Sequence, residues 1–154
     1  MLFFAFLAGN SIARAQFPAV TPKLYGSSPF QDSLWGIDTT NFSVFQRFGP
    51  TLAGFTITGM NGMAFDPTTY QTYIIMKVSG VSGRVLGTID LTTGVCTQVG
   101  NLGDNFSSLT FDDNGQLWGA TGNGATVPEA LYQIDKTTAA KTLMYSMGNG
   151  ADGE

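Results

Sequence analysis

The sequence predicts an all-β fold built from repeated units, and three observations support this prediction. A Leu-x-x-Ile-Asp motif occurs at residues 34–38, 86–90 and 131–135, with spacings of 52 and 45 residues. Short apolar segments rich in β-branched and aromatic side chains alternate with turn-forming residues, which is typical of strands. Only 12% of the residues are charged, and glycine occurs 20 times among 154 residues, as many turns and well-covered strands require.

Each unit is expected to contain four strands. In chain order these are a Phe-Asp segment, an aromatic-Gly segment, the Ile-Asp segment and a hydrophobic-Gly segment; Phe65-Asp66, for example, returns 46 residues later. Such repeats stack because one unit alone cannot bury its faces. Four strands per unit is the count of a β-propeller blade. The sequence therefore predicts an incomplete ring, a β-propeller-like array of about two and a half to three four-stranded blades, with units near 24–65, 66–111 and 112–154.

The turns between the predicted strands contain repeated aspartates. Asp38, Asp90 and Asp135 share one repeat position and precede threonine-containing turns, so we interpret them as Asx turns rather than catalytic groups. Asn114-Gly115 separates two predicted strands and favours a tight hairpin in which both residues take positive φ.

The N-terminus predicts a secretory signal peptide. Residues 1–8 are apolar, and Ala13-Arg14-Ala15 has the small-x-small form of a signal peptidase site, so we expect cleavage after Ala15. Residues 16–154 would then form the blade repeats of a secreted protein, extracellular or periplasmic. The alternative is a short, buried N-terminal apolar helix. No integral membrane insertion is expected, because the run falls short of the ~20 residues that a spanning helix needs.

Composition excludes several functional classes. Removing Arg14 leaves six Lys and Arg against eleven Asp and Glu, a net charge of about −5, which argues against a nucleic-acid partner. Histidine is absent, which excludes catalysis through a histidine base and zinc sites that need imidazole. The single cysteine, Cys96, cannot form an intramolecular disulfide and is expected to be a small buried or half-buried side chain.

Departures from the repeat are where a specific function is expected. Residues 50–59, 79–83 and 122–129 are insertions, and we expect the last two to flank one rim of the assembly. Aromatic side chains in or near loops could stack on a glycan or a peptide, although packing between blades is the alternative. These candidates are Trp35, Phe55, Tyr70 and Trp118.

Calcium is the one cofactor that the sequence suggests. Asp112, Asp113 and Asn114 carry the hard oxygen ligands that calcium prefers. They do not match the spaced loop of aspartates with a distal glutamate. An Asn-Gly hairpin explains the same residues without a metal.

The repeat also resembles a known family. Leu-Trp-Gly-Ile-Asp, Thr-Thr-Gly, Val-Gly-x-Leu-Gly and Leu-Thr-Phe-Asp-x-x-Gly-x-Leu-Trp-Gly are similar to the blade repeat of bacterial secreted β-propellers, the group with NHL-type, YncE-type and quinoprotein-like repeats. The resemblance covers residues 24–150. It implies the fold and leaves the activity open, because propellers host both binding modules and enzymes.

Two functions follow as expectations. The first is a non-catalytic extracellular recognition or scaffold module that presents loops to a glycan, peptide or protein; the absence of a catalytic motif favours it. The second is a fragment of a secreted propeller enzyme, such as a lactonase or a quinoprotein dehydrogenase, with its active site in missing blades. Because the repeat stops in mid-blade, we expect a fragment of a longer protein. Its partners would be the remaining blades, or further copies bound through exposed strand edges.

Overall fold

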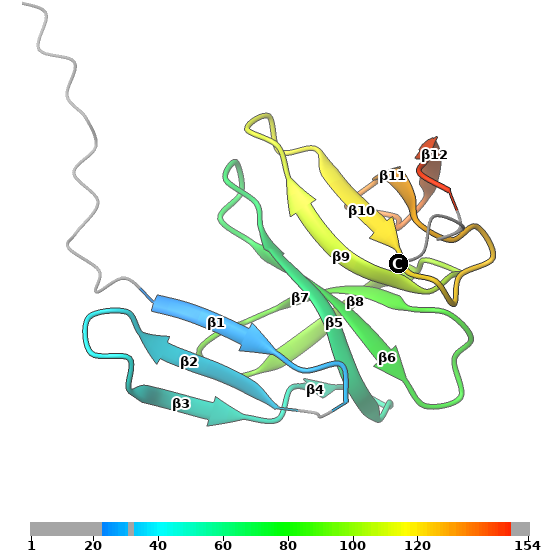
Figure 1. The fold of residues 1–154 in the computed structure, drawn as a ribbon. Coiled ribbons are helices and arrows are strands. Elements are labelled where there is room, and N and C mark those ends of the chain that lie inside the picture. The colour runs from blue at the N-terminus through cyan, green and yellow to red at the C-terminus, as the bar shows by residue number, and fades with distance from the viewer. Residues whose placement is uncertain (1–22, 31–32, 149–154) are drawn as a thin grey trace, which may run out of the picture.

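The computed structural model describes residues 23–30 and 33–148, so the predicted signal peptide, residues 1–15, lies outside the described residues. The described residues form twelve strands, without a helix, in three sheets that follow one another along the chain (Figure 1). This confirms the all-β fold class and the open, propeller-like array of sheets. None of the described residues belongs to a helix that could cross a membrane.

Each of the three sheets is built on an antiparallel meander whose neighbouring strands are consecutive in the chain. The first sheet has three strands: β1 (Lys23–Ser27), β2 (Leu34–Asp38) and β3 (Val44–Phe48). The meander of the second sheet has four: β5 (Ile57–Phe65), β6 (Thr72–Val78), β7 (Val85–Ile89) and β8 (Val95–Asn101). The third sheet also has four: β9 (Phe106–Phe111), β10 (Leu117–Thr121), β11 (Ala130–Ile134) and β12 (Lys141–Ser146).

The four predicted segments of a repeat are four consecutive strands of one sheet. The Phe-Asp segments end β5 and β9, and the Ile-Asp motifs end β2, β7 and β11. Each of these four-stranded meanders therefore starts with the strand that ends in the Phe-Asp segment, β5 or β9. The predicted units near 66–111 and 112–154 start at the turn after that strand. Among the described residues the first sheet has no counterpart of β5 and β9.

A short additional strand, β4 (Thr51–Leu52), extends the second sheet beyond β8. It runs parallel to β8, with Leu52 opposite Cys96, and Leu52 is buried. The sequence predicts an inserted loop at residues 50–59, and the structure corrects this. Burial of an apolar side chain beside an open sheet edge turns part of the insertion into a strand, and the start of β5 forms another part.

The middle sheet is covered on both of its faces. Along β6, Tyr73 and Ile75 belong to the core shared with the third sheet, whereas Ile74 and Met76 belong to the core shared with Leu34 of the first sheet. These four side chains of β6 are all buried. A strand with two covered faces needs no polar positions, which explains the near-continuous apolar sequence of β6.

The Asx turns predicted at the Ile-Asp motifs are present. Asp38, Asp90 and Asp135 each accept a 2.7 Å hydrogen bond from the backbone N–H two residues later, and a second bond of 2.5 to 2.7 Å from the hydroxyl of that same threonine. The threonine hydroxyl is the main reason that the pKa of each carboxyl is lowered. Asp66 makes the same turn with a Thr-Thr pair. Among the described residues this turn of aspartate and threonine therefore occurs four times, three of them at the Ile-Asp motifs.

The hairpin at Asn114-Gly115 differs from the prediction in one respect. Only Gly115 has a positive φ, of 76°, and its N–H donates to the carbonyl of Asp112 at 3.0 Å. A single left-handed glycine after an ordinary turn closes the hairpin between β9 and β10, so Asn114 does not need a positive φ.

Candidate functional site

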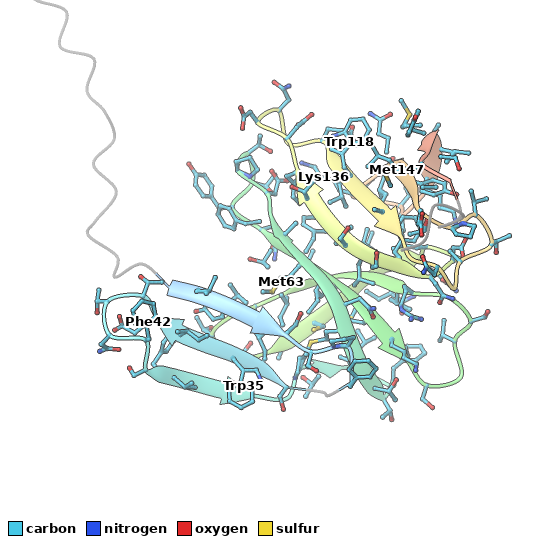
Figure 2. All side chains as sticks on the ribbon, viewed as in Figure 1. Trp35, Phe42, Met63, Trp118, Lys136 and Met147 are labelled. Carbon is cyan, nitrogen blue, oxygen red and sulfur yellow. The ribbon has the colours of Figure 1, made fainter. Side chains whose placement is uncertain are left out.

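The four aromatic side chains predicted to contact a ligand lie on four different elements. Trp35 lies within β2 and Trp118 within β10, both half-buried, so these two belong to strands rather than to loops. Figure 2 shows them in well-separated parts of the molecule. Phe55 lies in the loop between β4 and β5, and Tyr70 in the turn between β5 and β6; both are exposed.

Tyr70 belongs to a groove between the first and second sheets. Two adjoining hollows of about 380 and 350 Å³ share Phe65, Thr72 and Leu91. Tyr25 of β1 and Met63 of β5 line the first hollow, and Tyr70 lines the second. Together they form a largely apolar groove whose size suits a small ligand or one side chain of a partner.

An aromatic pair forms one wall of this groove. The rings of Phe65 and Tyr70 meet edge to face with centroids 6.0 Å apart, and the two residues are 54% and 63% exposed. Tyr70 has a φ of 60°, which is uncommon for a bulky residue. Its backbone N–H donates to the carbonyl of Asp66 at 2.9 Å. The turn thus fixes the backbone from which the ring projects.

Few polar groups lie near the groove. Gln71 and Asp90 line the second hollow beside Tyr70. One carboxylate oxygen of Asp90 already accepts bonds from its own turn, and the Gln71 side-chain amide donates to the Thr72 carbonyl at 3.4 Å. The groove therefore has the chemistry of an apolar or aromatic contact site with polar groups at one end.

Asp66, which begins the turn that carries Tyr70, forms a buried ion pair that joins the second and third sheets. Asp66 is fully buried, and the Lys136 ammonium donates to its Oδ2 at 2.5 Å and to the Gly115 carbonyl at 3.1 Å. Burial raises the pKa of Asp66, but the hydrogen bonds from Lys136, Thr68 and Thr69 outweigh it and hold the pKa far below its usual range. Asp66 is thus a structural carboxylate.

The calcium candidates form one end of the β9–β10 hairpin. Asp112 Oδ1 accepts the backbone N–H of Asn114 at 3.0 Å and that of Gln116 at 2.9 Å. Asp113 and Asn114 are exposed. Within the part of the chain that the structure describes, no three acidic or cysteine side chains gather as a metal site would require. Calcium binding stays a prediction, and the turn accounts for the bonded Asp112 oxygen without a metal.

The two insertions at 79–83 and 122–129 flank one rim, as predicted. Asp104, between β8 and β9, lies between them: its carbonyl accepts the N–H of Arg84 at 3.0 Å, and its Oδ1 accepts the N–H of Thr126 at 2.8 Å. Burial raises the pKa of Asp104, but backbone donors, chiefly Thr126, outweigh it and lower the pKa. The rim is held together by these bonds.

Cys96 is buried on β8, as predicted, and its thiol faces the carbonyl of Gly94 at 3.8 Å. Burial raises the pKa of the Cys96 thiol to about 11. A thiol in this state is a packing group, because the reactive form is the thiolate.

Sequence reasoning missed most of the groove. Tyr25, Met63 and Phe65 look like ordinary strand residues, and only the packing of the first sheet against the second brings them together. One sequence feature did point to Phe65: a large apolar residue directly precedes the Asp66 turn that presents Tyr70. Lys136, the partner of Asp66, lies 70 residues away in the chain and gave no indication of its role.

Comparisons with known proteins identify similar structures at low sequence identity. No family model and no curated protein matches this chain. A luciferin-regenerating enzyme is 19% identical over 73% of this chain, with a TM-score of 0.44. The hydrazine synthase of Kuenenia stuttgartiensis is 14% identical over 90%, with a TM-score of 0.48. A putative 6-phosphogluconolactonase from Bacteroides fragilis is 15% identical over 77%, with a TM-score of 0.42. This chain spans 35%, 38% and 33% of those three chains, respectively.

Proposed function

We propose that this chain is a non-catalytic recognition module that binds an apolar side chain of a peptide or protein partner in the groove between its first and second sheets. One observation carries the proposal: the exposed Phe65–Tyr70 pair lies on a groove that Tyr25, Met63 and Leu91 also line. Exposed aromatic rings beside an apolar hollow are the kind of surface on which binding energy concentrates.

The lining favours a peptide or protein over a glycan. A sugar needs several hydrogen-bonding groups beside its aromatic platform, whereas the first hollow is lined by uncharged and mainly apolar side chains. Met63 contributes an adaptable thioether that can fit different apolar groups. A glycan is the second candidate, supported by Gln71 and Asp90 at the end of the groove.

A phage-displayed random peptide library tests this function. Peptides selected on the wild-type protein should carry an apolar anchor residue, and a Phe65→Ser/Tyr70→Ser double variant should bind them at least about tenfold more weakly. Phe55→Ser is the matched control, because Phe55 is 50% exposed and does not line the groove. A glycan array with the same three proteins tests the second candidate. Selected peptides that bind the double variant as well as the wild type would contradict the proposal.

Secretion is part of the same proposal. It rests on the apolar N-terminal run and the predicted cleavage after Ala15. N-terminal sequencing of secreted protein should read from Gln16, and a mature protein that retains Met1 would contradict it. The alternative, part of a secreted propeller enzyme, stays a prediction that assigns the active site to blades outside this chain.

A further inference from the structure

The third sheet presents one face that the described residues leave uncovered. Trp118, Ala120, Leu131 and Tyr145 define this front face: Ala120 pairs with Leu131, and Leu131 pairs with Tyr145, so their side chains share one side of the sheet. Trp118, Ala120 and Leu131 are half-buried and border a shallow hollow of about 80 Å³, and Tyr145 is 64% exposed.

The repeat shows what this front face is suited to contact. Trp118, Ala120 and Leu131 occupy the repeat positions that Tyr73, Ile75 and Leu86 occupy in the second sheet. In the second sheet these three side chains are buried because the third sheet covers them. The front face of the third sheet therefore corresponds to the face of the second sheet against which the third sheet packs.

The first sheet presents the complementary face. Leu24, Trp35, Ile37 and Val44 define this back face, since Leu24 pairs with Ile37 and Ile37 pairs with Val44. Leu24 and Val44 are 56% and 52% exposed, and Trp35 and Ile37 are half-buried.

The repeat also gives the counterpart of this back face. Leu24, Trp35 and Ile37 occupy the repeat positions of Leu117, Tyr132 and Ile134 in the third sheet. Those three side chains are buried against the second sheet. The front face of the third sheet thus matches the second-sheet side of the junction between the second and third sheets, and the back face of the first sheet matches its third-sheet side. The two open faces are therefore suited to form the same kind of junction with each other.

We propose that two copies of this chain associate head to tail, with the back face of the first sheet of each copy packed on the front face of the third sheet of the other. Head-to-tail contacts form a ring if the rotation closes and a filament if it does not. Closed propellers contain four to eight sheets. The described residues of each copy form three sheets, so two copies supply six, a number within that range, and a dimer of this chain can close the ring. Neither face includes Phe65 or Tyr70, so this proposal is independent of the proposed recognition groove.

Sedimentation velocity of residues 16–154 over a concentration series tests the assembly. The wild type should sediment as a dimer, and Leu131→Glu on the front face should raise the dimer dissociation constant roughly 30-fold or more, because it places a charge at the centre of an apolar contact. Leu24→Glu on the back face should weaken the dimer comparably. Asn123→Glu is the matched control at an exposed loop position outside both faces. Circular dichroism should show that all three variants fold.

Mixing the two face variants separates this geometry from a contact between like faces. The Leu24→Glu copy retains an intact front face and the Leu131→Glu copy an intact back face, so an equimolar mixture should recover a dimer through one junction. A contact between two front faces would leave Leu24→Glu dimeric and would give no recovery on mixing. A wild type that stays monomeric throughout the series, or a Leu24→Glu variant that dimerises normally, overturns the proposal.

Discussion

Asp66 is held in its charged form inside the protein by its immediate neighbours. Five hydrogen bonds reach its carboxylate, four from the two threonines of its own turn and one from Lys136 of the third sheet. The Lys136 ammonium also lies 5.6 Å from the centre of the Phe111 ring. A buried carboxylate is tolerated only when it is paired and hydrogen-bonded, so Lys136 supplies a charge that the junction of two sheets requires.

Replacement of Lys136 tests that requirement. Lys136→Met keeps the length of the side chain and removes the charge, so Asp66 loses its ionic partner while remaining buried. We expect the free energy of unfolding, measured by urea denaturation, to fall by about 2–3 kcal/mol. Lys77→Met is the control at an exposed lysine, with an expected change within about 0.5 kcal/mol. Equal stability of the two variants would show that the ion pair is dispensable.

The lowered pKa of Asp66 predicts a dependence of stability on pH. The unfolded carboxyl binds its proton near the ordinary value of 3.8, and the folded one only at lower pH. Below the ordinary value the unfolded state binds more protons than the folded state. The contribution of the Asp66 carboxylate to the free energy of unfolding is therefore complete above the ordinary pKa and is lost as the pH falls. The melting temperature should fall more steeply between about pH 5 and pH 2 in the wild type than in Asp66→Asn. Parallel curves for the two proteins would contradict this role of Asp66.

At the scale of elements, one turn is used four times with different residues at its last position. The backbone N–H groups of Phe42, Tyr70, Gly94 and Ala139 donate to the carbonyl of the aspartate four residues earlier, at 2.8 to 2.9 Å. All four residues have a positive φ, between 58° and 77°. Glycine takes this conformation without strain, whereas the other three residues are held in it by the turn.

Gly94→Ala measures the strain that this turn imposes. A Cβ in the left-handed region raises the energy by about 1–2 kcal/mol, so the unfolding free energy should fall by that amount. Gly26→Ala is the matched control: Gly26 lies on β1 without a positive φ, and a Cβ there would meet no atom within 4 Å. If the Gly94 variant is as stable as the Gly26 variant in urea denaturation, the turn does not require its left-handed residue.

The elements were largely predictable, and the exceptions have physical causes. The Ile-Asp strands and their Asx turns follow from local chemistry, because a strand sequence ending in aspartate and threonine specifies both. β4 was not predictable, since its two residues form a strand only beside the β8 edge. The groove at Phe65 and the pairing of Asp66 with Lys136 depend on contacts between sheets, about which a repeat pattern gives no direct information.

At the scale of the whole molecule, the position of a sheet in the stack decides how well its side chains are covered. The second sheet lies between two others, and most β6 side chains are buried, whereas its repeat counterpart in the third sheet, β10, alternates buried and half-buried residues. Equivalent residues therefore differ in burial because of their neighbours rather than their chemistry. The order of sheets followed from the repeat, and both the recognition groove and the proposed dimer depend on it.

Amide hydrogen exchange of the Leu131→Glu variant, which keeps the front face of the third sheet open, tests this stacking most directly. Exchange is slowest where opening requires the loss of most of the core. We expect the amides of β6 to exchange roughly 100-fold more slowly than those of β2, the middle strand of the first sheet. Exchange of β6 as fast as that of β2 would contradict a middle sheet covered on both faces.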